Sequence, residues 1–282
     1  MAEILPGLEP GPPPIITARP VALPAAVAEP APRPLELASL SRRDAALDLV
    51  LVVVTALVFP FGASLAAYLL EGGESSRPLE TGPLVLAKWF DALLVVWLAA
   101  YFVYRHRLTS AAFGLQAEGV RRQVLWSLPT LLAMYGAMIP MVVAITVLVM
   151  LRPELQGDLM RRKEFMQRIP LQSLGQMVLL LIPVAIHEEL LFRGLLIPYL
   201  RRVGCGWTGA ILFSTALFAS LHIAQGWLGI VQIFPVGLTL AVFFVLTRSL
   251  TAVILAHFLF DLLQTQLARL LWPSLEKFFQ NA

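Results

Sequence analysis

Charged residues are scarce in this sequence. Lysine, arginine, aspartate and glutamate make up 14% of the 282 residues, whereas hydrophobic residues make up 58%. Soluble globular domains carry about a quarter charged residues and are nearer half apolar. This balance argues against one water-soluble core and indicates a membrane protein. The formal net charge is only +3 and the basic residues lie in short loops, so the sequence gives no case for nucleic-acid binding.

Cysteine and a secretory leader are also lacking. Cys205 is the only cysteine, so no intramolecular disulfide can form. Residues 1–41 have no basic start followed by an apolar run, which argues against a cleavable signal peptide. Proline, by contrast, is concentrated there, with ten of the 21 prolines. Proline at that density sustains neither a helix nor a strand, so we predict a disordered N-terminal tail over residues 1–41.

Long apolar runs follow the tail. Each is near or above the ~20 residues that a helix needs to cross a bilayer. They cover residues 45–70, 84–104, 123–151, 172–200, 207–225, 227–246 and 250–272. They lack the alternation of barrel strands, so the sequence predicts an all-α fold: a polytopic transmembrane helical bundle of about seven to eight spans, with a polar cavity near mid-membrane. Residues 42–171 are expected to form N-terminal transmembrane helices, and residues 172–282 the core that holds the polar residues.

Basic residues predict the orientation, because arginine and lysine are enriched in short cytoplasmic loops. If the seven runs alternate, most arginines fall on one side, which places the N-terminus in the cytoplasm. These are Arg42, Arg43, Arg105, Arg107, Arg121, Arg122, Arg201, Arg202 and Arg248. The loop at 152–171 does not fit, because it is basic but should lie outside. Either it is an amphipathic surface segment, or the number of spans differs there.

Several ionisable residues lie inside the predicted spans, where they are costly and are usually functional. They are His187, Glu188, Glu189, Arg193, His222, His257 and Asp261. Counted from the cytoplasmic ends of their helices, the depth is about 20 Å for Glu188, about 22 Å for His222 and about 16 Å for Asp261. Three helices therefore carry carboxylates and imidazoles to overlapping levels. Neighbouring helices would bring these groups into one polar pocket.

Helical spacing separates the roles of the two adjacent glutamates. Glu188 and Glu189 point about 100° apart, so we do not expect both to face one point. Glu189 and Arg193 are spaced i, i+4 and can form a structural ion pair. Glu188 is left as a carboxylate that can take a proton from water, with His222 as a second partner for that water. His257 and Asp261 are also spaced i, i+4 and share one helix face.

Other interpretations apply to single residues. His187 faces elsewhere on its helix, and its imidazole is expected to bond a backbone carbonyl rather than act directly. Glu188, His222 and His257 could form only a buried hydrogen-bond network, although three helices would then carry polar groups for no evident gain in stability. A zincin motif is excluded, because HExxH needs histidine where Leu191 stands.

Three short motifs in this region resemble the CPBP family. EELLFR (Glu188 to Arg193) is similar to its EExxxR motif, FASLH (Phe218 to His222) to FxxxH, and HFLFD (His257 to Asp261) to HxxxN or HxxxD. The family groups CAAX endopeptidases, which trim prenylated proteins, with bacteriocin-processing and self-immunity proteins. Each motif alone is weak, but all three occur in order inside apolar runs. The resemblance covers roughly residues 172–265.

The resemblance implies a helical intramembrane protease whose cavity opens towards the cytoplasm, with residues 172–282 as the catalytic core. By this analogy Glu188 and His222 activate water, and His257 and Asp261 stabilise the oxyanion or order the site. An ionised Asp261 would repel an oxyanion, so Asp261 is protonated, turned towards His257 or bound to a cation. Metal dependence stays open. Glu188, His222, His257 and Asp261 could ligate Zn²⁺, and the family is also described as metal-free glutamate proteases.

The predicted function is therefore an endopeptidase that hydrolyses a membrane-associated or lipidated protein in a bacterial cytoplasmic (inner) membrane. Its expected partners are that protein or peptide substrate and the lipid bilayer. One alternative is a transporter or proton relay, because intramembrane acidic and histidine residues also serve ion pathways. The sequence shows no internal repeat to favour it. The other alternative is a non-catalytic immunity or scaffold protein that binds a partner helix.

Overall fold

The computed structural model describes residues 37–70, 81–116, 119–160 and 173–281, apart from residues 38 and 159. The chain divides into two units, Met1–Pro32 and Arg33–Ala282, and every described residue belongs to the second. The predicted disordered tail thus lies almost wholly outside the described residues. At its end, Leu37 and Leu40 are buried in the hydrophobic core, so these residues belong to the folded part.

The fold is all-α, as predicted. The described part of the chain contains eight α-helices: α1 (Arg42–Leu70), α2 (Thr81–His106), α3 (Val120–Leu151), α5 (Leu174–Glu189), α6 (Ile197–Val203), α7 (Trp207–Ser220), α8 (Trp227–Thr247) and α9 (Leu250–Asn281). Three short 3-10 helices join them: η1 (Ser110–Phe113), η2 (Pro153–Leu155) and η4 (Ile223–Gln225). Every predicted span overlaps one of these helical segments.

The fourth predicted span is one helical run with an unusual centre. It begins at a capping box, in which the Ser173 hydroxyl accepts from the Gln176 backbone and the Gln176 side chain accepts from the Ser173 backbone. Between α5 and α6 the run becomes a π-helix, η3 (Leu190–Leu196). The run ends at Gly204, whose φ of 110° is a left-handed conformation that glycine adopts without strain. π-Helical turns are rare and often occur at functional sites.

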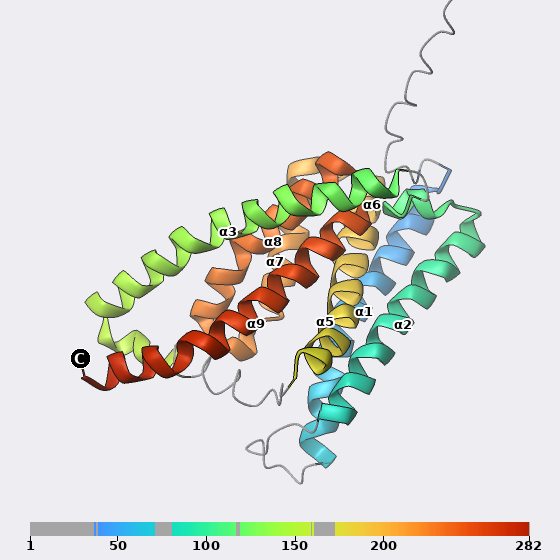
Figure 1. The fold of residues 1–282 in the computed structure, drawn as a ribbon. Coiled ribbons are helices and arrows are strands. Elements are labelled where there is room, and N and C mark those ends of the chain that lie inside the picture. The colour runs from blue at the N-terminus through green and yellow to red at the C-terminus, as the bar shows by residue number, and fades with distance from the viewer. Residues whose placement is uncertain are drawn as a thin grey trace, which may run out of the picture. The chain divides into compact units, whose positions relative to one another are not determined.

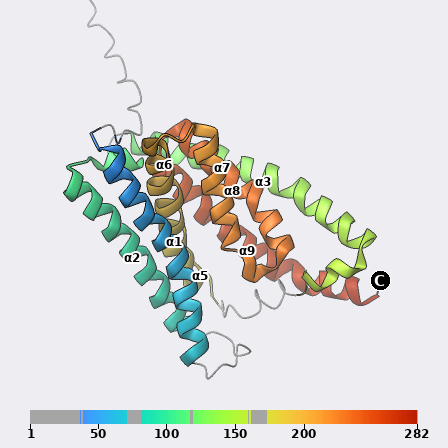
Figure 2. The ribbon, with the colours of Figure 1, turned by 180° about the vertical axis from the view of Figure 1, so that it is seen from behind.

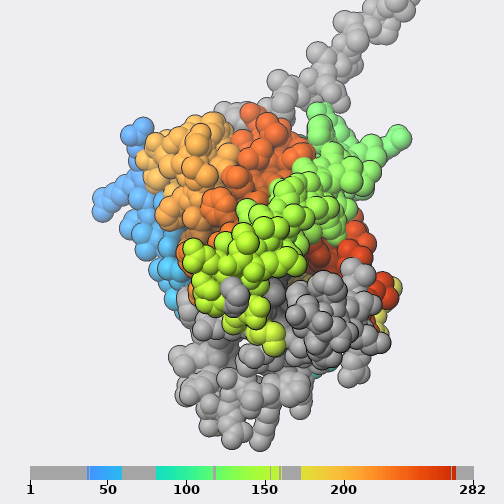
Figure 3. All heavy atoms as spheres, turned by 90° about the vertical axis from the view of Figure 1, so that its left-hand side faces the viewer, coloured from blue at the N-terminus to red at the C-terminus, as the bar shows by residue number. Residues whose placement is uncertain are grey.

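The helices pack around this run. Figures 1 and 2 show α1 and α2 on one side of α5, and α7, α8 and α9 on the other. Helix α5 packs against both α2 and α9, while α3 packs along α8 and α9. On the face seen in Figure 3, α3 lies over the C-terminal helices. The π-helical segment contacts α1, α7 and α9, which places it at the centre of the packing.

The surface of the bundle is strongly apolar. Large side chains such as Trp97, Leu93 and Leu132 are well over half exposed. Exposed apolar surface of this extent marks contact with another apolar phase. Within the described ranges, four helices are long and apolar enough to cross a membrane: Thr81–His106, Val120–Leu151, Trp227–Thr247 and Leu250–Leu267. These features indicate an integral membrane protein. The predicted number of seven to eight spans stays a prediction.

Candidate active site

The candidate site lies where the end of α5 meets α9. Helix α5 supplies Glu188 and Glu189 just before the π-helical segment begins. Helix α9 supplies His257 and Asp261 one turn apart. The structure therefore brings together two of the three motifs through direct side-chain contacts. The third motif lies next to them, at the end of α7 and in the turn that follows it.

Glu189 and Arg193 form the ion pair that their spacing predicts. Arg193 Nη1 lies 2.8 Å from Glu189 Oε1, and both side chains are 0% exposed. Arg193 also donates from Nη2 to the carbonyl oxygen of Gly237 on α8, over 2.9 Å. Its Cζ lies 4.4 Å from the centre of the Phe218 ring on α7. The guanidinium thus links three helices, which is a structural role.

His257 lies between the carboxylates. Its Nδ1 is 2.7 Å from Glu189 Oε1, and because a carboxylate only accepts, Nδ1–H is the donor. Its Nε2 is 3.4 Å from Asp261 Oδ2 and 3.7 Å from Glu188 Oε2. Glu188 and Glu189 thus do not face one point, as expected, but both lie beside the same imidazole. The ring is wide enough to present a different nitrogen to each glutamate.

Exposure separates the two glutamates. The Glu188 side chain is 22% exposed and the Asp261 side chain 28%, whereas His257 is 6% exposed and Glu189 0%. Glu188 and Asp261 thus form the accessible edge of the cluster, and Glu189 lies behind His257. A small molecule such as water can reach Glu188 but not Glu189. This arrangement suits a reactive role for Glu188 and a supporting role for Glu189.

His222 does not lie within a helix, contrary to the predicted span 207–225. Helix α7 ends at Ser220, and His222 lies in the turn before η4, which closes at Gly226 with a φ of 84°. The His222 Nδ1 atom lies 3.0 Å from the carbonyl oxygen of Phe218, one of the carbonyls left unpaired at a helix end. Since a carbonyl only accepts, Nδ1 carries the proton and Nε2 of the neutral ring is an acceptor.

Phe218 connects His222 to the rest of the site. Its ring centre lies 4.9 Å from that of His222 and 6.1 Å from that of His257. Among the described residues, the structure records no direct contact between His222 and Glu188. Their joint action on one water stays a prediction.

A metal centre has no support in the geometry of the described residues. In that part of the chain, no three His, Cys, Asp or Glu side chains are placed to hold one ion. Asp261 is turned towards His257. This favours the alternative in which Asp261 holds His257, over a protonated Asp261 or one bound to a cation.

His187 is buried, and within the described ranges its Nε2 has no hydrogen-bond partner. This atom therefore does not make the expected bond to a carbonyl.

Sequence reasoning missed two features of the site. The first is the π-helical segment, for which the apolar sequence Leu190 to Leu196 gives no local signal. The second is Gly237, whose carbonyl accepts from Arg193 and whose missing side chain leaves room for Phe218. A glycine within the apolar run of α8 was a weak hint of close helix packing, because small residues let membrane helices approach closely.

Part of the chain matches the model of a known protein family. Residues 170–263 match the model of a family described as type II CAAX prenyl endopeptidase Rce1-like. No curated protein and no solved structure matches the chain. The match includes all three motifs, helix α5 and the first part of α9. At residues 170–263, the chain therefore carries a domain of the Rce1-like type II CAAX prenyl endopeptidase (CPBP) family.

Proposed function

We propose that this protein is an intramembrane endopeptidase that uses Glu188 to activate water against a peptide bond of a membrane-associated or lipidated protein. The observation that carries the proposal is the contrast between the accessible Glu188 and the buried Glu189, on either side of His257. The family match at residues 170–263 supports proteolysis over other uses of such a cluster. The same family description supports the choice of a lipidated substrate.

The short length of α7 supports a water-filled cavity. Its 14 residues rise about 21 Å, which is less than the ~30 Å hydrocarbon core of a bilayer. The turn that holds His222 would then lie at membrane depth. Non-helical backbone is tolerated there only where protein covers it or where it lines a water-filled cavity. His222 would thus meet the water that hydrolysis consumes.

The chemistry follows from the positions of these groups. Glu188 takes a proton from water while Nε2 of His222 accepts a hydrogen bond from the same molecule. The water oxygen attacks the carbonyl carbon, and the carbonyl electron pair moves to its oxygen. Glu188 then returns the proton to the amide nitrogen, the electron pair on the oxyanion re-forms the carbonyl, and the C–N bond breaks. The products are a carboxylic acid and an amine, and transfer of the acid proton to the amine gives a carboxylate and an ammonium ion. His257, held by Glu189 and Asp261, orders this edge of the site.

The membrane arrangement belongs to the same proposal. The seven helical segments that overlap the predicted spans would each cross or enter the bilayer, with the N-terminus in the cytoplasm of a bacterial cell. This orientation places Arg201 and Arg202, which follow the site helix, on the cytoplasmic side. A substrate anchored in the inner leaflet would then reach the site from that side.

A cleavage assay with matched variants tests the proposal. Membrane proteomics of wild-type and Glu188→Gln strains identifies precursors that accumulate when cleavage stops. Purified protein in liposomes is then given those precursors and an internally quenched peptide that ends in a farnesylated CAAX sequence. We expect Glu188→Gln and His222→Ala to be folded and inactive, while Glu154→Gln, at an exposed position in η2, retains wild-type activity. Cleavage by Glu188→Gln, or proton flux by wild type without cleavage, would contradict the proposal.

A further inference from the structure

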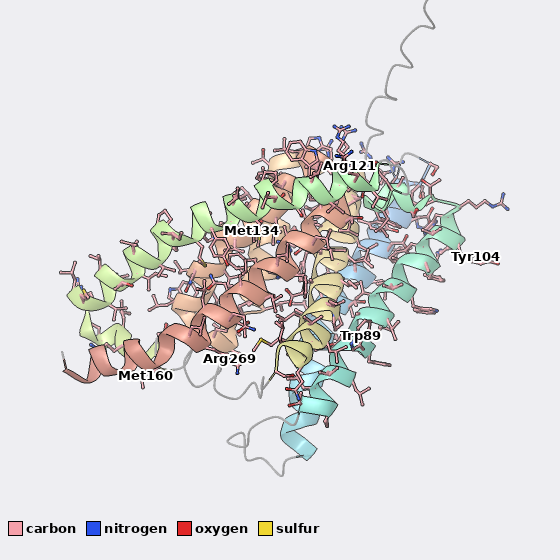
Figure 4. The ribbon with its side chains drawn as sticks, in the orientation of Figure 1. Trp89, Tyr104, Arg121, Met134, Met160 and Arg269 are labelled. Carbon is pink, nitrogen blue, oxygen red and sulfur yellow. The ribbon has the colours of Figure 1, made fainter. Side chains whose placement is uncertain are left out.

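Asp158 lies just beyond η2, at the end of the arm that α3 and η2 form. Its Oδ2 atom accepts a hydrogen bond of 3.2 Å from the backbone N–H of Leu228, in the first turn of α8. In Figure 4, Arg121 marks the start of α3, and Met160, two residues after Asp158, marks the region where the arm ends. The arm therefore reaches the helix that directly follows the turn at residues 222–226, here called the His222 turn.

The start of α8 takes its capping oxygen from this arm. The first N–H groups of a helix have no partner within the helix, and a side-chain oxygen of the N-cap residue usually accepts from one of them. The N-cap residue of α8 is Gly226, which has no side chain to do so. Asp158 supplies the oxygen instead, and a carboxylate also suits the positive end of the helix dipole.

Gly226 lets the arm approach the His222 turn closely. Its φ of 84° lies in the left-handed region that favours glycine. A Cβ atom added there would lie 3.0 Å from the backbone oxygen of Asp158 and 3.4 Å from its Cγ. The backbone at the end of the His222 turn is thus packed directly against Asp158.

A small apolar cluster holds the arm against the same end of α8. Its buried members are Ile145 and Val149 on α3 and Leu228 on α8, and the partly buried Leu155 of η2 packs against them. Leu228 thus takes part in both contacts, through its side chain here and through its N–H to Asp158. Apolar contacts are not directional, whereas a hydrogen bond is, so the bond to Asp158 determines where the first turn of α8 lies.

The two ends of the His222 turn determine where His222 lies, because the turn is short and bonded within itself. The backbone N–H of Gln225 donates to the carbonyl oxygen of His222 over 2.9 Å. At the α7 end, Nδ1 of the imidazole donates to the carbonyl oxygen of Phe218. At the α8 end, the turn closes at Gly226, against Asp158.

We propose that Asp158 is a positioning residue for His222. By capping α8 and packing against Gly226, it holds the His222 turn so that Nε2 of the imidazole faces the water to be activated. A residue that precedes the family match at residues 170–263 would thus help to form the site. A displacement of about 1 Å caused by a distant substitution can cost about 100-fold in rate. This inference rests on the proposed function, because it names the residue that orients His222 for the same hydrolysis.

The kinetic test compares Asp158→Ala with Asp158→Asn and Asp48→Ala. Asparagine keeps an oxygen that caps a helix about as well as aspartate, whereas alanine has none. Asp48 accepts a hydrogen bond from Tyr199 between α1 and α6, so its loss destabilises the protein elsewhere. Each protein is assayed in liposomes with the farnesylated peptide and with the precursors from Glu188→Gln cells. We expect kcat of Asp158→Ala to fall about 10- to 100-fold with KM nearly unchanged, and the two other variants to keep kcat per folded molecule within about threefold.

Histidine spectra separate positioning from a general loss of structure. The chain has four histidines, so in protein labelled with ¹⁵N at histidine the His222 signals are those that His222→Ala lacks. In mildly alkaline buffer, a neutral ring held with its proton on Nδ1 gives two distinct nitrogen signals, whereas a ring that exchanges between tautomers gives averaged ones. We expect distinct signals in the wild type and in Asp158→Asn, and averaged signals in Asp158→Ala.

The outcomes distinguish this inference from the proposed function. A wild-type kcat or unchanged His222 signals in Asp158→Ala would overturn the inference, and with Glu188→Gln inactive the proposed function would still stand. An equal loss of kcat in Asp48→Ala, or an Asp158→Asn variant as slow as Asp158→Ala, would also overturn the inference. A wild type that cleaves neither substrate would overturn the proposed function, and the His222 signals alone would then test whether Asp158 holds the turn.

Discussion

His257 on α9 donates a hydrogen bond from Nδ1 to Oε1 of Glu189 on α5, over 2.7 Å. The same carboxylate oxygen accepts from Arg193 over 2.8 Å. One oxygen atom thus holds an imidazole and a guanidinium in place, and both of these bonds are buried. Oε1 of Glu189 is occupied by these bonds, whereas the partly exposed Glu188 is the glutamate that we propose to act on a substrate.

Glu189→Gln should unfold far more easily than the wild type. The substitution leaves the Arg193 charge fully buried without its counter-ion, and breaking a buried pair in this way costs about 3 to 5 kcal/mol. The measurement is the melting temperature or the denaturant midpoint of detergent-purified protein. We expect less folded protein in the membrane as well as a lower melting temperature.

Glu188→Gln is the matched control for that experiment, because it makes the same chemical change at the adjacent residue. Glu188 is partly exposed, and its nearest recorded charge contact is 3.7 Å from His257. We therefore expect a melting temperature close to that of the wild type. Equal stability of Glu189→Gln and Glu188→Gln would show that the buried pair does not hold the fold.

Gly237→Ala should damage the site through packing alone. A Cβ atom at this position would lie 2.8 Å from Cδ1 of Phe218, which is too close, and 3.5 Å from Nη2 of Arg193. Displacing Phe218 would disturb its contacts with Arg193 and His222. We expect a loss of about 1 to 3 kcal/mol of unfolding free energy and reduced cleavage.

Gly136→Ala provides the contrast, since a Cβ there meets nothing within 4 Å. Gly136 lies inside α3, where alanine is favoured over glycine by about 0.5 to 1 kcal/mol. The two glycine substitutions should therefore change stability in opposite directions. Melting curves that shift the same way for both would contradict the role given to Gly237.

A second buried polar cluster should contribute to stability away from the site. Asp48 Oδ2 on α1 lies 2.6 Å from Nε2 of His106 and accepts a hydrogen bond of 3.2 Å from Tyr199. It thereby joins α1 to α2 and α6. Asp48→Ala leaves the Tyr199 hydroxyl buried and unpaired, so we expect the unfolding free energy to fall by about 1 to 3 kcal/mol.

Tyr199→Phe should lower the unfolding free energy by about 1 kcal/mol, which is less than the loss in Asp48→Ala. The reason is that phenylalanine would leave no unpaired hydroxyl on α6. The double variant should then lose less than the sum of the two single losses, since both substitutions remove the same bond. A strictly additive loss in melting experiments would show that the hydrogen bond between Asp48 and Tyr199 contributes nothing.

The sequence alone determined the fold class and the chemical content of the site. Long apolar runs can satisfy their backbone hydrogen bonds in lipid only as helices, so the all-α class followed from composition and length. The pair Glu189 and Arg193 followed from spacing as well, because residues four apart share one face of a helix. Such relationships are local, because they depend only on residues within one segment of the chain.

Only the tertiary structure decided which groups meet across helices. It brings Glu188 and Glu189 to opposite nitrogens of His257, ends α7 at Ser220, and seats Phe218 against Gly237. It also brings α3 along α9, so that Tyr135 reaches Phe260. These outcomes depend on how ridges and side chains of different helices fit together, and no periodicity within one helix specifies its neighbour.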